Sequence, residues 1–164
     1  MKAWIYRGIT GALLLLWMMI IFGFSAQTAA QSDEVSSSVS VHMIETANEM
    51  FELGLTQEQI GWYAQEIEHL VRKLAHMAEY AILGILSASC ALGYWSWGKK
   101  AAIGSFLFAA CYAVTDEVHQ LYVAGRTGSV WDVCIDSAGV FLGLFFFGLG
   151  LKLAERIAKR TGFK

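Results

Sequence analysis

Nine ionisable or hydrogen-bonding side chains recur at helical spacing within otherwise apolar stretches, and they are the candidate site residues of this chain. An α-helix turns by about 100° per residue, so residues three or four positions apart share a face. Charge within lipid is costly and is kept where it is paired or acts on a ligand. In such a cluster basic groups can hold an anion, while carboxylates orient them or accept hydrogen bonds from hydroxyl and amine groups. The nine residues are Lys73, His76, Glu79, Tyr80, Asp116, His119, Gln120, Arg126 and Asp132.

Four apolar segments are each long enough to cross a membrane, and the last three carry or adjoin these residues. The 164 residues are 56% hydrophobic and only 16% charged, whereas a soluble domain has about 25% charged residues. A helical span needs about 20 mostly apolar residues. We therefore predict an all-α, polytopic membrane protein: a bundle of four transmembrane helices with a short amphipathic external helix. The predicted spans are residues 4–24, 74–97, 101–124 and 130–151.

The distribution of basic residues predicts how these spans are oriented. Of the 12 Lys and Arg residues, nine fall at the N-terminus, in the turn at 98–100 or after residue 151. Cytoplasmic segments carry an excess of Lys and Arg, so both termini are predicted to be cytoplasmic and the candidate site residues to face outward. Residues 1–30 also fit a cleaved signal peptide, but the apolar run to Phe24 is long for one. We favour a first span that is retained.

The segment between the first two spans is predicted to begin as a linker and to end as a helix. Residues 31–40 are Ser-rich, which is typical of a flexible linker. Within 41–53 apolar side chains recur at helical spacing opposite glutamates, which predicts a short amphipathic helix with Gly54 as its C-cap. Thr56 and the glutamine three residues later have the form of a capping box. A long helix is therefore expected from about Gln57 into the second span.

The whole chain is predicted to be a single membrane domain. Its basic C-terminal tail is more typical of a headgroup anchor than of a nucleic-acid site, so no nucleic-acid partner is expected. The three cysteines lie within spans at no metal-like spacing and are expected to pack as small apolar residues. The predicted parts are the first span with its outer end (1–27), the external segment (28–68), the three-span core (69–151) and the tail (152–164).

Other polar residues and two glycines complete the pattern of the spans. Asp136 lies on a stripe of the last span that continues through Gly139 and Gly143. This GxxxG spacing would let another helix approach closely below the polar residues. Glu117 points away from the polar face of its own span and is predicted to be a solvated carboxylate at the interface. Arg72 is expected to extend its charge to the surface.

Two other interpretations of the cluster stay open. The charges could neutralise one another as a salt-bridge network that only locks the bundle. Alternatively, pairs at i, i+3 on two helices could hold zinc with an open coordination position, although the nearby basic residues would repel a cation. No cofactor is therefore expected, and zinc is kept as a lesser alternative. Its ligands would be His76, Glu79, Asp116 and His119.

Several short segments of this sequence resemble, in the same order, the motifs of the VanZ-like family of bacterial membrane proteins. Two positions depart from the family pattern. The family usually has proline before the arginine of the outer loop, where this chain has Ala124-Gly125, and it often has asparagine where Asp136 stands. The matching runs are residues 21–27 (IFGFSAQ), 72–80 (RKLAHMAEY), 116–120 (DEVHQ), Arg126, Asp132 and 136–139.

The resemblance implies a multi-pass protein of the bacterial cell membrane, and the founding member of the family is linked to low-level teicoplanin resistance. It supplies no catalytic mechanism, so whether the protein is an enzyme is left open. Our leading hypothesis is an outward-facing polar site that binds an anionic lipid or cell-envelope component. One alternative is an intramembrane hydrolase or transferase, metal-assisted or not, with His76 or His119 as general base. The other is a structural partner of an envelope complex that makes its contact through the 41–53 helix.

Overall fold

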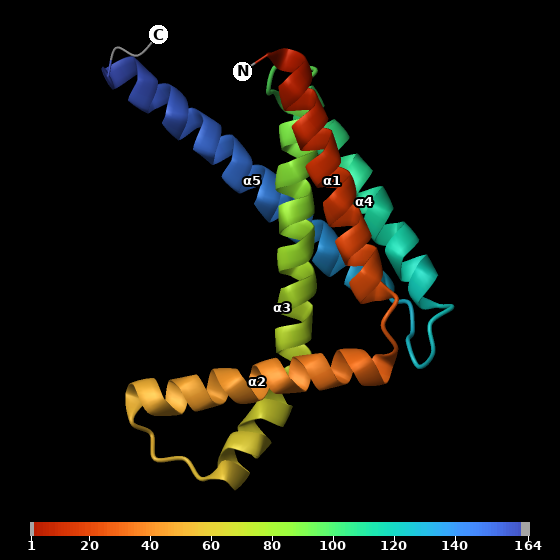
Figure 1. The fold of residues 1–164 in the computed structure, drawn as a ribbon, viewed down its shortest axis with the longest axis vertical. Helices are drawn as coiled ribbons and strands as arrows, with labels where there is room; N and C mark the ends of the chain where they lie inside the picture. Colours follow the sequence, from red (N-terminus) through yellow and green to blue (C-terminus); the bar gives the residue numbers. More distant parts are fainter. Residues whose placement is uncertain (1, 162–164) are drawn as a thin grey trace.

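The computed structural model describes residues 2–161, and over that range it consists of five α-helices joined by short connections (Figure 1). Four of the five helices are long and apolar enough to cross a membrane, and α2 is not among them. No strand occurs within residues 2–161. The predicted all-α class with four spans is confirmed. The helices are α1 (Ala3–Ser25), α2 (Ala29–Phe51), α3 (Gln57–Leu92), α4 (Lys99–Gln120) and α5 (Val130–Thr161).

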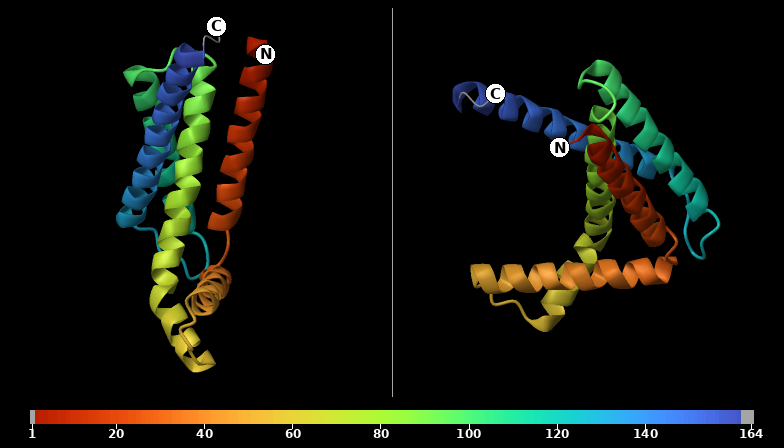
Figure 2. Two further views of the ribbon diagram at one scale, coloured as in Figure 1. Left: turned by 90° about the vertical axis from the view of Figure 1, so that its left-hand side faces the viewer. Right: turned by 45° about the horizontal axis from the view of Figure 1, so that its top comes forward.

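The central helix of the bundle is α3, which packs against each of the other four helices. Its most extensive contact is with α5, and in the left view of Figure 2 it stands between α1 and α5. The beginning of α1 and the end of α5 lie at the same end of the bundle (Figures 1 and 2). An even number of spans returns the chain to the side from which it started.

Glycines bring α5 against the backbone of α3. A Cβ atom at Gly139 would collide with the carbonyl oxygen of Met77, and one at Gly143 with that of Ala81. From the other side, Gly84 of α3 faces the backbone of α5 at Val140, where a Cβ atom would also be too close. Small residues allow two membrane helices to approach until their backbones touch. The predicted role of the GxxxG stripe is therefore confirmed.

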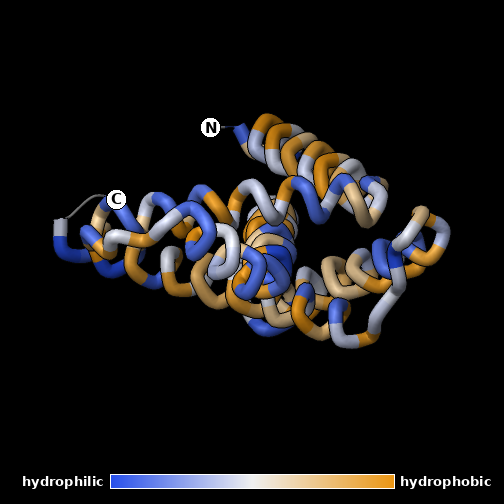
Figure 3. The backbone as a smooth tube through the Cα atoms, turned by 90° about the horizontal axis from the view of Figure 1, so that it is seen from below, coloured by the Kyte–Doolittle hydropathy of each residue, from blue (hydrophilic) through white to orange (hydrophobic). Residues whose placement is uncertain are grey.

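Aromatic side chains anchor α1, whose contact with the bundle is less extensive than that of α5. The indole Nε1 of Trp17 donates a hydrogen bond to the carbonyl oxygen of Glu79 at 2.9 Å. The Tyr112 hydroxyl of α4 donates to the carbonyl oxygen of Met18 at 2.6 Å. Hydrophobic residues dominate the length of α1 in Figure 3, as expected of a helix whose outer surface faces lipid.

The structure corrects the prediction of a flexible linker at residues 31–40, which lie within α2. The helix begins early because Thr28 and Gln31 form a capping box: the Gln31 N–H donates to Thr28 Oγ1 at 3.3 Å, and the Thr28 N–H donates to Gln31 Oε1 at 3.0 Å. The hydroxyls of Ser36 and Ser40 each donate to the carbonyl oxygen one turn earlier. Serines bonded in this way are compatible with a helix interior.

The predicted 41–53 helix is the second half of α2, and its end also differs from the prediction. Glu52, with φ 51°, is the left-handed C-cap, and its N–H donates to the carbonyl oxygen of Asn48. The helix has therefore closed before the chain reaches Gly54. The whole of α2 runs crosswise to the spans (Figure 1) and packs on the first part of α3. That helix starts directly after its Thr56 capping box, as predicted.

Candidate functional site

The polar stripes of α3, α4 and α5 meet at the end of the bundle near α2. Lys73 of α3 forms a salt bridge with Asp132 of α5, and each side chain is about a quarter exposed. The start of α2 closes the same end, because the Ala29 N–H donates to the carbonyl oxygen of Ala124 at 3.2 Å. The loop that carries Arg126 is thereby joined to the start of α2.

Asp116 is the buried centre of this polar cluster. It is 3% exposed, and its carboxylate faces the side chains of Ser25, Tyr80 and Gln120 without reaching hydrogen-bond geometry. Both Asp116 carboxylate oxygens, Ser25 Oγ, the Tyr80 hydroxyl and Gln120 Nε2 are buried with no hydrogen-bond partner in the described chain. Buried polar atoms are nearly always bonded. Asp116, Ser25, Tyr80 and Gln120 therefore form one buried polar group shared by α1, α3 and α4, with hydrogen-bonding capacity that another polar group could use.

Arg126 brings positive charge to the same place. Its Nε donates to the carbonyl oxygen of Gln27 at 3.2 Å, and its guanidinium lies within electrostatic range of His76 and Glu79. His76 Nδ1 is 3.8 Å from Glu79 Oε2. Arg126 has no salt bridge with a carboxylate anywhere in residues 2–161. Arg126 is thus held in place through its Nε, while the other N–H groups of its guanidinium form no salt bridge with a carboxylate of the described chain.

Asp136 extends the cluster deeper into the bundle. It is 1% exposed, and both of its carboxylate oxygens lack a hydrogen-bond partner among residues 2–161. Tyr80 lies within electrostatic range of Asp136 as well as of Asp116, so this tyrosine is near two buried carboxyl groups. Asp136 lies about one turn from Gly139, where α5 lies against the backbone of α3. Close helix packing thus forms the floor of the polar cluster.

His119 flanks the cluster on the side of α1. Its ring lies 4.5 Å from the ring of Phe22, centroid to centroid, and its Nε2 is buried without a hydrogen-bond partner in the part of the chain that the structure describes. It remains within electrostatic range of Asp116. All nine predicted residues therefore lie at this end of the bundle. Lys73 and Asp132 bond to each other, and the other seven gather around Asp116 and Arg126.

Two expectations about individual charges were wrong. Glu117 is not a solvated carboxylate: it is 6% exposed and accepts a hydrogen bond from the Ser129 N–H at 2.8 Å. The loop after α4 folds back over it, which the helical periodicity of α4 alone does not reveal. Arg72 does not extend freely to the surface, because it bonds Asp33 at 2.6 Å and Glu68 at 2.9 Å. It joins α2 to α3, since α2 begins early enough to cover it.

Contributions from α1 were missing from the predicted site. Ser25 ends α1 and faces Asp116, and the run of residues 21–27 was the one signal in the sequence that pointed to it. Trp17 supports the backbone at Glu79, and no spacing or motif in the sequence indicates this contact. Both depend on how α1 packs against α3 and α4, which is a tertiary feature.

The geometry gives no support to a zinc site. Among the residues that the structure describes, no group of three or more His, Cys, Asp or Glu side chains is arranged to hold a metal ion. His76 and Glu79 form one pair on α3. His119 on α4 packs against Phe22 of α1.

Comparison with known protein families identifies the family of this chain. Residues 10–151 match the sequence model of the VanZ/LLP1 family. The chain belongs to the VanZ/LLP1 family. The match begins within α1 and ends within α5, so every residue of the polar cluster lies inside the VanZ/LLP1 region. No curated protein and no solved structure matches the chain significantly. Family and fold together identify a multi-pass membrane protein.

Proposed function

We propose that this VanZ/LLP1 protein binds an anionic lipid or another anionic cell-envelope component at its polar cluster. The observation that carries the proposal is the group of buried polar atoms around Asp116 without hydrogen bonds of ordinary geometry, near an arginine that forms no salt bridge within the described residues. Ionisable side chains within a membrane span mark a functional site by default. Here three spans, the end of α1 and the loop before α5 supply them to one place.

The residues of the cluster divide into two chemical roles. The guanidinium of Arg126 presents several N–H donors in a planar fork that matches phosphate and carboxylate oxygens. His76 adds an imidazole donor beside it. Asp116 and Glu79 would accept hydrogen bonds from hydroxyl or amine groups of the same ligand, and Tyr80 can donate or accept. An amphiphile that carries both an anion and such donors fits this pairing of charges.

Lys73 takes a different role from the one that its sequence position suggests. It is bonded to Asp132 across α3 and α5, so we assign it to holding α5 in place rather than to gripping the ligand. A purely structural network would pair the remaining charges in the same way. Arg126 has no such pair within residues 2–161, and neither oxygen of Asp116 or Asp136 has a hydrogen-bond partner. That difference favours a binding site over a lock.

We further propose that the cluster faces outward in a bacterial cell membrane. The excess of Lys and Arg lies at the opposite end of the bundle, which the positive-inside rule assigns to the cytoplasm. Lipid-linked envelope precursors and the acylated glycopeptide teicoplanin act at the outer face. A contribution to teicoplanin resistance, with which the founding family member is linked, is consistent with a site in that compartment.

The proposal can be tested by lipid analysis and native mass spectrometry of the detergent-purified, full-length protein. The informative variant is His76→Ala/Arg126→Ala, and the matched control is Arg156→Ala/Lys159→Ala, which removes basic groups from the exposed end of α5. We expect the wild type and the control to retain an anionic lipid or precursor and the cluster variant to lose it. Teicoplanin sensitivity of cells that carry each variant should follow the same order.

Two results would contradict the proposal. The first is an unchanged bound species in a folded His76→Ala/Arg126→Ala protein, which would place binding elsewhere. The second is a wild type with no bound anionic species whose cluster variant is merely less stable. That result would make the cluster a structural lock and direct attention to protein partners, which α2 could contact.

A further inference from the structure

We propose that a second site, at the opposite end of the bundle from the polar cluster, holds an anionic phospholipid. Its acyl chain occupies a cavity between α1, α3 and α4, and its phosphate lies at the first turn of α4. This site shares no residue with the polar cluster and does not rest on the function proposed above. Four features argue for it: an apolar cavity, a buried polar atom, an uncapped helix start and an excess of positive charge.

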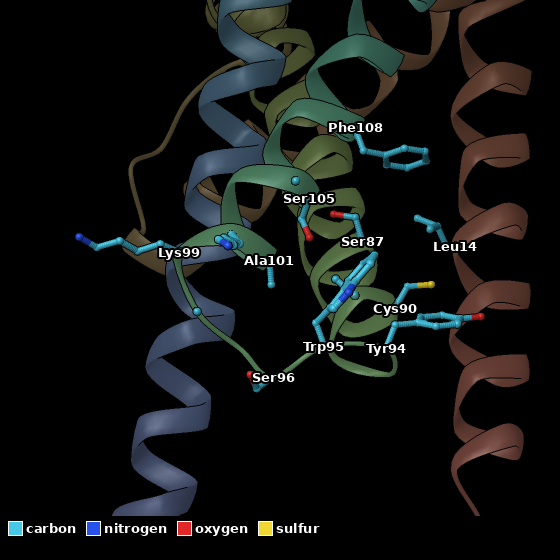
Figure 4. Close-up of a pocket in the computed structure, with 14 residues that line it drawn as sticks. Leu14, Ser87, Cys90, Tyr94, Trp95, Ser96, Lys99, Ala101, Ser105 and Phe108 are labelled. Carbon is cyan, nitrogen blue, oxygen red and sulfur yellow. The ribbon is translucent and has the colours of Figure 1, made fainter.

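The cavity has a volume of about 960 Å³, which is at the upper end of the range of about 300–1,000 Å³ for ligand pockets. Its lining is mostly apolar and includes Leu14 of α1, Cys90 of α3 and Phe108 of α4 (Figure 4). It exists because α1 and α4 contact each other less than either contacts α3. An acyl chain is the ligand that such a lining suits inside a membrane.

One polar atom in the cavity wall has no partner within the chain. Ser105 is 4% exposed, and its Oγ makes no hydrogen bond with any described residue. Figure 4 shows this side chain among the residues that line the cavity. Ser87, on the facing helix, instead donates to the carbonyl oxygen of Gly84 at 2.9 Å. Ser105 lies six residues into α4, about 9 Å along its axis, where its hydroxyl could donate to an ester carbonyl of a phospholipid.

The cavity is bordered by the positively charged start of α4. Gly98 provides no side-chain cap, and the first turn contains no acidic residue. Lys99 and Lys100 instead occupy this turn, although cations are disfavoured at a helix N-terminus and anions are favoured there. Arg7 of α1 lies at the end of α3, where its Nε donates to the carbonyl oxygen of Gly93 at 2.7 Å and its guanidinium lies over the ring of Tyr94, which borders the cavity. None of these three basic residues forms a salt bridge within residues 2–161.

The aromatic residues of the turn between α3 and α4 set the depth of this site. Tyr94 and Trp95 border the cavity and are more than half exposed, and such residues favour the headgroup level of a membrane. The first turn of α4 is therefore at the height of lipid phosphates, with the apolar cavity at the depth of acyl chains. A peptide or a second copy of the chain would not require a site with positive charge at one end and an apolar cavity beside it. Every anionic phospholipid matches such a site, because it joins a charged headgroup to apolar acyl chains.

The test uses the full-length protein in nanodiscs that contain a phosphatidylglycerol with a diazirine in its acyl chain. After illumination, crosslinked peptides are located by mass spectrometry, and the matching phosphatidylcholine probe serves as the neutral comparison. We expect crosslinks within residues 87–108, several-fold stronger with phosphatidylglycerol. Lys99→Gln/Lys100→Gln should reduce them several-fold, toward the level of the phosphatidylcholine probe, because both charges near the phosphate are lost.

A cavity-filling variant makes the test independent of charge. A Cβ atom at Gly104, which lines the cavity, meets nothing within 4 Å. Its Cβ position is thus open, so Gly104→Trp adds a large ring at the cavity wall, and we expect it to abolish the crosslinks. The matched control is Gly150→Trp on α5, which also has open space around its Cβ but does not line the cavity. The His76→Ala/Arg126→Ala variant should leave this labelling unchanged, which separates the two sites.

Three outcomes would overturn the proposal. Equal labelling by the phosphatidylglycerol and phosphatidylcholine probes would show that the site does not select an anionic headgroup. Unchanged labelling in a Gly104→Trp protein that elutes and melts like the wild type would show that the acyl chain does not occupy the cavity. A dimer in native mass spectrometry that disappears in Gly104→Trp, without lipid crosslinks, would assign the cavity to a second copy of the chain.

Discussion

Substituting Gly143 should separate α5 from α3 and thereby disturb the polar cluster above. A Cβ atom at this position has no room, because it would meet the carbonyl oxygen of Ala81, which belongs to the helix backbone and cannot rotate away. Overpacking costs about 1–3 kcal/mol, whereas alanine in place of glycine contributes up to about 1 kcal/mol of helix propensity. We therefore expect Gly143→Ala to lower the free energy of unfolding by about 1 kcal/mol, and Gly143→Leu by about 2 kcal/mol or more.

A matched control is available on the same helix. Gly150 is exposed, and a Cβ atom there meets nothing within 4 Å. Gly150→Ala and Gly150→Leu should therefore be neutral or slightly stabilising, by up to about 1 kcal/mol. The assay is reversible unfolding of the purified protein by sodium dodecyl sulfate in mixed micelles, followed by tryptophan fluorescence and circular dichroism. Free energies are compared at the same detergent fraction.

The sign of the difference between the two glycines decides the matter. If Gly143→Leu is as stable as Gly150→Leu, α5 does not depend on backbone contact with α3. The same conclusion would follow if Gly143→Ala were more stable than the wild type. Either result would refute the packing argument, and with it the claim that the floor of the polar cluster is fixed by the glycine stripe.

Three further predictions follow from other contacts. Lys73→Met should lower the free energy of unfolding by about 1–3 kcal/mol, because it leaves Asp132 partly buried and unpaired. In a double-mutant cycle, Lys73→Met/Asp132→Leu should recover much of the lost stability. Additive losses from the two substitutions would contradict the pairing. Trp17→Phe removes the hydrogen bond to Glu79 and should cost about 1 kcal/mol, measured by the same unfolding assay; no change would show that α1 is not anchored there. Thr28→Ala removes the cap of α2 and should cost about 1 kcal/mol locally, seen as faster hydrogen exchange in its first turn, and unaltered exchange would count against the capping box.

The four spans could be predicted because their lengths and apolar character leave few alternatives in a membrane. The GxxxG stripe was equally readable, since Gly139 and Gly143 fall on one face of a regular helix. The helix at residues 31–40 was missed although its start carries a signal. Thr28 and Gln31 have the same Thr-x-x-Gln pattern that correctly indicated the start of α3. The Ser-rich composition led us to predict a linker despite this capping pattern. A Ser-rich composition occurs both in linkers and in helices whose serine hydroxyls bond the preceding turn.

The candidate site was predictable only as far as helical periodicity reaches. Residues on the inner faces of α3, α4 and α5 were found in this way. The contacts of Glu117 depend on the path of the loop at 121–129, and those of Ser25 depend on how α1 docks. Neither is encoded in the spacing of one helix. The cavity near Gly104 results from incomplete packing between α1 and α4, which no pattern in either segment reveals.

The most direct test of the central claim is an experimental structure of the full-length protein in lipid nanodiscs, at a resolution that shows side chains. We expect a polar group from a bound lipid or envelope component within about 3 Å of the Arg126 guanidinium, with Asp116 and Tyr80 bonded to that ligand or to ordered water beside it. A structure in which Arg126 bonds directly to Glu79 or Asp116, with no ligand between them, would contradict the claim and make the cluster a lock within the bundle.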